Sequence, residues 1–183
     1  MDTKTVPPGA TADGAVFVFR SIVLGWAGDV FRWHERPDAL LDLAPLRRWM
    51  RIERREGGLR DGARITFSFG AGPLRLRWEA RHYGYVNGTQ FCDEQVRGPF
   101  RVWRHRHRVV PVGAGQTWYE DRVEYAVPGG PLAQRLARPL VGLLLSRLFA
   151  RRHQIVRQAF VSLAAGRASR SAKLETQVTR NAR

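Results

Sequence analysis

Residues 93–128 constrain the fold of this chain more than any other stretch, because they form two long runs of alternating residues joined by Gly113-Ala114-Gly115. Alternation on both sides of a glycine-containing turn is typical of an antiparallel β-hairpin. Since a one-residue slip would turn every apolar side chain to solvent, the pattern also fixes the register. A three-residue loop would pair Val112 with Gln116 and place His107 opposite Asp121.

The predicted hairpin has two unlike faces. The pairs expected on its inner face are Val109 with Tyr119, His107 with Asp121, His105 with Val123 and Trp103 with Tyr125. Those expected on its outer face are Arg108 with Glu120 and Arg104 with Glu124. The opposite charges outside support the same register as the aromatic residues inside. Because a buried carboxylate is costly unless it is paired or hydrogen-bonded, we expect the inner face to line a pocket or to contain a His–Asp pair.

The rest of the chain predicts further strands and a long C-terminal helix. Alternation marks strands at residues 15–22, 49–56, 63–69, 74–85 and 89–96. Helical spacing marks two short helices after the first strand, at residues 25–36 and 38–43, with Asp38 as the cap of the second. A helix at residues 139–165, after a short piece at 132–137, is the only element large enough to cover the apolar face of the sheet. The predicted fold class is therefore α+β, with a curved seven-stranded antiparallel sheet wrapped around a long C-terminal helix.

One domain, residues 15–165, accounts for all of these elements. Residues 1–14 are rich in Pro, Gly, Thr and Asp without periodicity, and they are predicted to be a disordered lead-in. Gly166 is expected to end the helix, and residues 166–183 are predicted to be a basic disordered tail.

The net charge of +15 would ordinarily suggest nucleic acid or an anionic membrane as a partner. Lys4 and Lys173 are the only lysines, however, and an excess made almost wholly of arginine is typical of a compositional bias of the genome. The single cysteine, Cys92, excludes an internal disulfide and fits a reducing compartment. With neither a signal-peptide pattern nor an apolar run of membrane-spanning length, a cytoplasmic protein is expected.

Several short motifs resemble those of bacterial SRPBCC proteins described as polyketide cyclase/dehydrase-like. The motifs are Phe91-Cys92-Asp93-Glu94-Gln95, Gly98-Pro99-Phe100, Trp103-Arg104-His105, Asp121-Arg122-Val123-Glu124-Tyr125, Pro128 and Arg152-His153. The resemblance covers residues 15–165 and implies the helix-grip fold of the START and birch-pollen-allergen superfamily. It also implies a deep cavity between sheet and long helix that accepts a small apolar or amphipathic molecule. It implies no particular reaction, because this superfamily contains carriers, sensors and enzymes.

The candidate ligand-binding residues combine the inner face of the sheet with the buried face of the long helix. They are Phe17, Phe19, Trp78, Phe91, Asp93, Trp103, His105, His107, Tyr119, Asp121, Tyr125, Leu148 and Arg152. Arg152 stands in the middle of an apolar helix face. Its guanidinium therefore either meets an acceptor, such as Asp93, Asp121 or a ligand carboxylate, or extends to solvent along the helix edge.

Two other functions remain open at this point. The first is a cofactor-independent cyclase, dehydratase or isomerase, in which His107 oriented by Asp121 removes a proton next to a carbonyl and Tyr125 or Arg152 stabilises the oxyanion. In the alternative, these polar groups have a structural role only and hydrogen-bond to one another within the core. The second is binding of nucleic acid or anionic lipid on the basic outer face, where interleaved glutamates favour a solvated surface instead.

Neither a metal nor a cofactor is expected from the sequence. His105 and His107 share a strand face, but neither a further cysteine nor a Glu-x-x-His pattern completes a metal site. His34, at the end of the first predicted helix, is expected to take part in a cap interaction.

Overall fold

A seven-stranded antiparallel sheet forms the body of the molecule in the computed structural model, which describes residues 14–44 and 47–181, with side chains to Gly166. The strand order is β1-β7-β6-β5-β4-β3-β2. The strands are β1 (Ala15–Leu24), β2 (Met50–Glu56), β3 (Arg64–Phe69), β4 (Leu76–Val86), β5 (Gln90–Arg97), β6 (Val102–Gly113) and β7 (Gln116–Ala126). The helices are α1 (Ala27–Glu35), α2 (Ala39–Leu43) and α3 (Gly130–Asn181), with 3-10 turns at Arg47–Trp49 and Gly72–Leu74. The predicted α+β class is confirmed, and the predicted lead-in falls outside the described residues except for Gly14.

The register of the β6–β7 hairpin is as the alternating pattern predicted. Val109 pairs with Tyr119, His107 with Asp121, His105 with Val123 and Trp103 with Tyr125, and both outer pairs of opposite charge are also present. The turn itself differs, because Gly113 rather than Val112 pairs with Gln116. The loop between these partners is Ala114-Gly115, in which Gly115 supplies the positive φ of 66° needed to reverse the chain. The register shift between Pro111 and Gly113 then restores the pairing predicted for the rest of the hairpin.

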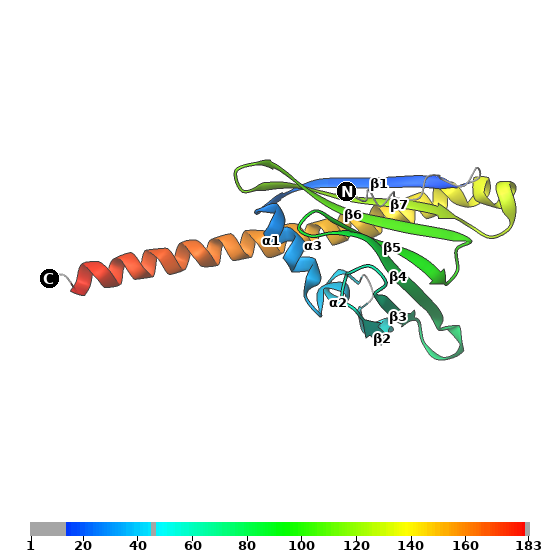
Figure 1. Ribbon diagram of the computed structural model, residues 1–183, viewed down its shortest axis with the longest axis horizontal. Helices are drawn as coiled ribbons and strands as arrows, with labels where there is room; N and C mark the ends of the chain where they lie inside the picture. Colours follow the sequence, from blue (N-terminus) through cyan, green and yellow to red (C-terminus); the bar gives the residue numbers. More distant parts are fainter. Residues whose placement is uncertain (1–13, 45–46, 182–183) are drawn as a thin grey trace.

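Helix α3 lies along one side of the sheet, packing mainly against β1, and its last part projects beyond the strands (Figure 1). Leu145, Phe149, Val156 and Phe160 form its buried face. The helix is continuous through Pro139 and runs past Gly166 to Asn181, so the predicted break and the predicted end at Gly166 are both wrong. One glycine costs about 1 kcal/mol in a helix, and the Ala, Arg, Glu, Gln and Leu residues that follow are good helix formers.

Helices α1 and α2 close one end of the space between sheet and α3 (Figure 1). Helix α1 buries Val30, Phe31, Trp33 and His34 against Phe91 and Tyr119. It begins two residues later than predicted, at Ala27. Asp38 precedes α2 but already has helical backbone angles, so its side chain cannot fold back onto the first turn and makes no cap hydrogen bond.

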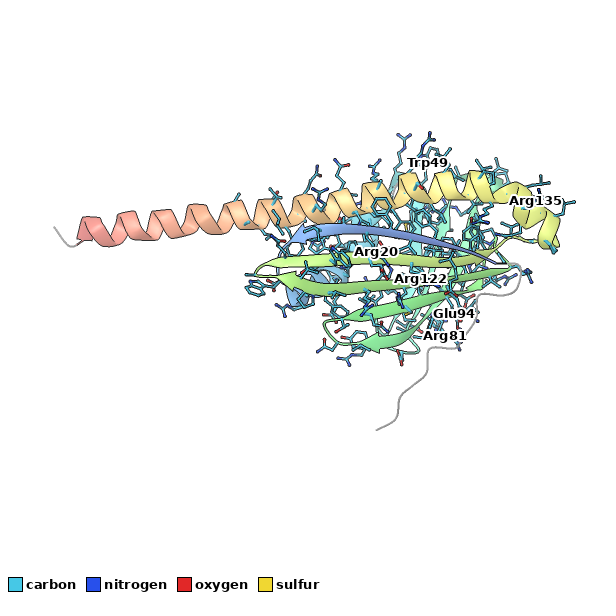
Figure 2. The ribbon with its side chains drawn as sticks, turned by 90° about the horizontal axis from the view of Figure 1, so that it is seen from above. Arg20, Trp49, Arg81, Glu94, Arg122 and Arg135 are labelled. Atoms are coloured by element: carbon cyan, nitrogen blue, oxygen red, sulfur yellow. The ribbon has the colours of Figure 1, made fainter. Side chains whose placement is uncertain are left out.

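The outer face of the sheet carries arginines and glutamates that form ion pairs, and Arg20, Arg81, Glu94 and Arg122 are labelled in Figure 2. Glu120 accepts from Arg20 at 2.6 Å and from Arg106 at 2.8 Å, and Arg81 pairs with Glu94. Carboxylates thus interrupt the basic surface, which argues against a continuous site for a polyanion. Among the described residues, no helix combines the length and apolar composition needed to cross a membrane.

Candidate functional site

All five histidines of the chain are buried on the inner side of the sheet. They come from four separate elements and are only 1% to 8% exposed: His34 in α1, His82 in β4, His105 and His107 in β6, and His153 in α3. Five buried imidazoles are costly unless they are hydrogen-bonded. Their partners therefore define the candidate site.

Asp121 is the centre of this cluster. Its side chain is fully buried, and its Oδ1 accepts a hydrogen bond from His105 Nε2 at 3.0 Å while its Oδ2 accepts one from His153 Nε2 at 2.9 Å. His107 Nδ1 lies 2.6 Å from Oδ1, in ion-pair range but off the direction of a well-aligned hydrogen bond. Burial alone would raise the pKa of the Asp121 carboxyl, but the three imidazoles hold that pKa well below its usual value. Asp121 is therefore an ionised carboxylate shared by three rings.

Asp93 lies on the cavity side of the same imidazoles. The β5–β6 register places it opposite His105, and its Oδ2 is 3.4 Å from His105 Nδ1 and 3.6 Å from His107 Nε2. Burial opposes ionisation of Asp93, yet the neighbouring imidazoles keep its pKa far below the usual range. Burial likewise lowers the pKa of His105, but the carboxylates on its two sides outweigh it and raise that pKa to about 9.

His34 has a fixed tautomer. Its Nδ1–H donates to the Val30 carbonyl at 2.8 Å, so its Nε2 accepts from the Tyr119 hydroxyl at 3.0 Å. Burial, together with the nearby His107, lowers the pKa of His34 to about 3. The prediction that His34 takes part in a cap interaction at the helix end is therefore wrong, because this side chain is a neutral core residue that orients Tyr119.

A cavity with a volume of about 350 Å³ opens between the sheet, α2 and α3. Its apolar wall includes Leu40, Leu43, Ile65, Phe67, Phe69, Trp78, Val141, Leu145 and Leu148. Its polar end consists of His34, His82, Asp93, His105 and His107, and Arg55 and Arg152 add two cationic groups. The aromatic side chains line this space without filling it.

The predicted site residues divide into two groups. Those that line the cavity are Trp78, Phe91, Asp93, Trp103, His105, His107, Leu148 and Arg152. Those that lie behind the wall are Phe17, Phe19, Tyr119, Asp121 and Tyr125. Phe17 packs on the ring of Phe149 at 5.6 Å, and Phe19 packs on the ring of His153 at 4.6 Å, so both support α3.

The sequence did not identify three members of the polar cluster: His34, His82 and His153. Each lies on an element outside the central hairpin, so no spacing within the chain brings it near Asp121. The one signal for His153 was the Arg152-His153 motif, and its ring bridges Asp121 and Ser21, whose Oγ is 2.7 Å from Nδ1.

Arg152 lines the cavity and is half-buried. Its Nε makes a long hydrogen bond of 3.4 Å to the Leu43 carbonyl, and its guanidinium lies 5.5 Å from the centre of the Phe149 ring. No carboxylate of the described residues lies within ion-pair distance of it, so neither Asp93 nor Asp121 is its partner.

Three histidines have shifted pKa values: burial lowers the pKa of His34 and of His82, whereas the carboxylates around His105 raise its pKa. Together they predict a stability maximum near pH 6.5. Below that pH, the unfolded chain protonates His34 while the folded protein does not, so stability falls as pH falls. Above it, the folded protein keeps the His105 proton that the unfolded chain loses, so stability falls until about pH 9. Each shifted histidine contributes a slope of up to about 1.4 kcal/mol per pH unit. Urea unfolding in EDTA at pH 5, 6.5 and 8 measures the loss of stability on both sides of the maximum. His34→Gln is expected to reduce the loss on the acid side only, where His82 still contributes. A flat profile from pH 5 to 8 would contradict these assignments.

Comparisons with known proteins show similarity in three-dimensional structure but no match by sequence. No family model and no curated protein matches the sequence. Norcoclaurine synthase from Thalictrum flavum, solved in complex with dopamine and hydroxybenzaldehyde, superposes with a TM-score of 0.60 at 17% identity, covering 88% of this chain and 98% of that one. A START superfamily protein from Mycobacterium smegmatis gives 0.56 at 14% identity, with 81% and 98% covered. The ZhuI aromatase/cyclase from Streptomyces sp. R1128 gives 0.57 at 12% identity, with 80% and 93% covered.

Proposed function

Because the chain has the helix-grip fold of START-like proteins, we propose that it binds a small apolar or amphipathic molecule in the cavity between the sheet and α3. The observation that carries the proposal is the cavity itself, about 350 Å³ with apolar walls and one polar end. Small-molecule sites are mostly apolar clefts of about 300–1,000 Å³ with a few polar groups that fix orientation. This cavity lies at the small end of that range, which favours a compact ring system over a long lipid chain.

The polar side chains of the cavity favour two kinds of polar group on the ligand. At the inner end, Asp93 and His107 can hydrogen-bond a hydroxyl or a carbonyl. Arg152 carries a positive charge that lacks a carboxylate partner among the described residues, so it favours an anionic group such as a carboxylate. An aromatic acid with a second polar substituent would meet both requirements.

A specific observation favours acid–base catalysis as a second candidate. His107 lines the cavity and has Asp121 behind its Nδ1, which is the arrangement of a base oriented by a carboxylate. In this proposal His107 removes a proton next to a ligand carbonyl, and Arg152 stabilises the oxyanion. Tyr125, the alternative oxyanion donor considered from the sequence, lies in the core behind the wall.

Ligand binding is tested with 1-naphthoic acid and its methyl ester, using quenching of tryptophan fluorescence by each compound. Both are expected to bind the wild-type protein, because Trp78 and Trp103 line the cavity. Arg152→Ala is expected to weaken binding of the acid about tenfold more than binding of the ester, which corresponds to about 1.4 kcal/mol for the lost charge-assisted contact.

Arg151→Ala is the matched control, since Arg151 is the exposed neighbour on the same helix. It is expected to leave both affinities unchanged. If Arg152→Ala weakened binding of the acid and of the ester equally, Arg152 would not be the partner of an anionic group on the ligand. Failure of both compounds to bind the wild-type protein would count against the proposed cavity function.

A further inference from the structure

Three potential ligand atoms converge at the inner end of the cavity: Asp93 Oδ2, His105 Nδ1 and His107 Nε2, all within 4.8 Å of one another. The carboxylate oxygen is 3.4 Å from the first nitrogen and 3.6 Å from the second. These separations are long for hydrogen bonds. They are close to the spacing of about 3.3–3.4 Å between neighbouring ligands of a tetrahedral ion that is bound at about 2.0–2.1 Å.

Asp121 prepares both imidazoles for a cation. It accepts from His105 Nε2 at 3.0 Å and lies 2.6 Å from His107 Nδ1, on the side of each ring away from Asp93. When the ring N–H faces Asp121, a neutral imidazole presents a lone pair to Asp93. Histidines that bind metals usually donate their other ring N–H to a carboxylate in this way.

The charge of the cluster is also compatible with a bound cation. Asp121 is 0% exposed and the Asp93 side chain 18%, so two carboxylates share a site with little access to water. A divalent ion with neutral imidazoles would balance this charge.

His82 provides the independent observation. It is buried, it lines the same cavity, and the β4–β5 register places it opposite Asp93. Its Nδ1 has no hydrogen-bond partner in the described part of the chain. A buried nitrogen without a partner is costly, and a bound ion or its coordinated water would satisfy it.

We infer that Asp93, His105 and His107 bind a divalent transition-metal ion of the Zn²⁺ or Fe²⁺ class at the inner end of the cavity. Imidazole and carboxylate ligands suit such ions, and three protein ligands leave a position open for water or for a cavity ligand. No local sequence motif indicates this site, because Asp93 comes from β5 and the two histidines come from β6. The inference goes beyond the proposed function, since ion binding requires no organic ligand.

Co²⁺ is the probe that tests the site, because its visible absorption reports coordination directly. Full-length protein is stripped with EDTA, dialysed and titrated with CoCl₂. The expected result is one tightly bound ion with the intense d–d absorption of a four- or five-coordinate site, bleached by an equivalent of ZnCl₂. Asp93→Asn preserves the shape of the side chain and is expected to weaken Co²⁺ binding more than about 100-fold. Removing a carboxylate that only hydrogen-bonds to a metal ligand already costs about 10–100-fold, and Asp93 would be a ligand itself. Glu56→Gln, an exposed carboxylate on β2, is the matched control and should bind as the wild type does.

Two results would overturn the inference. One is a wild-type spectrum that remains that of the hydrated ion in excess Co²⁺, a measurement that does not depend on any variant folding. The other is unchanged Co²⁺ binding by a folded Asp93→Asn protein. Neither result bears on naphthoate binding, so this inference and the proposed function can fail separately.

Discussion

Asp121→Ala is expected to lower the free energy of unfolding by about 3–5 kcal/mol at pH 7, the cost of removing one partner from a buried charged cluster. The carboxylate is fully buried and serves His105, His107 and His153 at once. Without it, the N–H groups of His105 and His153 lose their acceptor, and protonated imidazoles of the cluster lose their nearest counter-charge. Urea unfolding followed by circular dichroism measures the loss.

The matched control for this experiment is Asp38→Ala. Asp38 is exposed and makes no cap hydrogen bond, so its replacement should change stability by no more than about 0.5 kcal/mol. If Asp121→Ala also cost less than about 1 kcal/mol, the cluster would not depend on this carboxylate, and the reconstruction of the site around it would be wrong.

Phe149→Ala is expected to cost about 3–5 kcal/mol, the usual range for truncating a buried phenylalanine. Phe149 is 0% exposed and fixes α3 to the sheet, with its ring 5.6 Å from Phe17 and 5.1 Å from His105. Removing the Phe149 ring leaves a cavity that the neighbouring side chains of β1 and β7 do not fill. Urea unfolding again gives the magnitude.

Leu136→Ala is the control on the same helix, because Leu136 is 70% exposed and truncating it removes little buried surface. Its effect should stay within about 0.5 kcal/mol. Similar losses for Phe149→Ala and Leu136→Ala would mean that α3 does not pack on the sheet through the face described above.

The register of the central hairpin could be predicted from the sequence because a slip reverses the direction of every side chain. The pairing of His107 with Asp121 follows from that rule alone. The turn could not be predicted in the same way, since the bulge between Pro111 and Gly113 absorbs a one-residue difference without moving any later pair. The end of α3 was missed for a related reason, because one glycine weakens a helix without ending it.

The histidine cluster marks the limit of what the sequence predicts about the site. A residue pattern shows which face of an element is buried, but not which distant elements meet there. His34 and His153 come from two different helices, α1 and α3, and they reach Tyr119 and Asp121 respectively only in the folded structure. The paired arrangement of Asp93 with two imidazoles likewise depends on the β5–β6 register, which the hairpin pattern does not specify.

Methyl-labelled NMR with 1-naphthoic acid tests most directly whether the space between the sheet and α3 is an open ligand cavity. The account predicts that chemical shifts change at Ile65 and Leu148, whose side chains line the cavity, and stay constant at Leu132 and Leu136 on the exposed face of α3. Shifts confined to the exposed leucines, with Ile65 and Leu148 unmoved at saturating ligand, would contradict it.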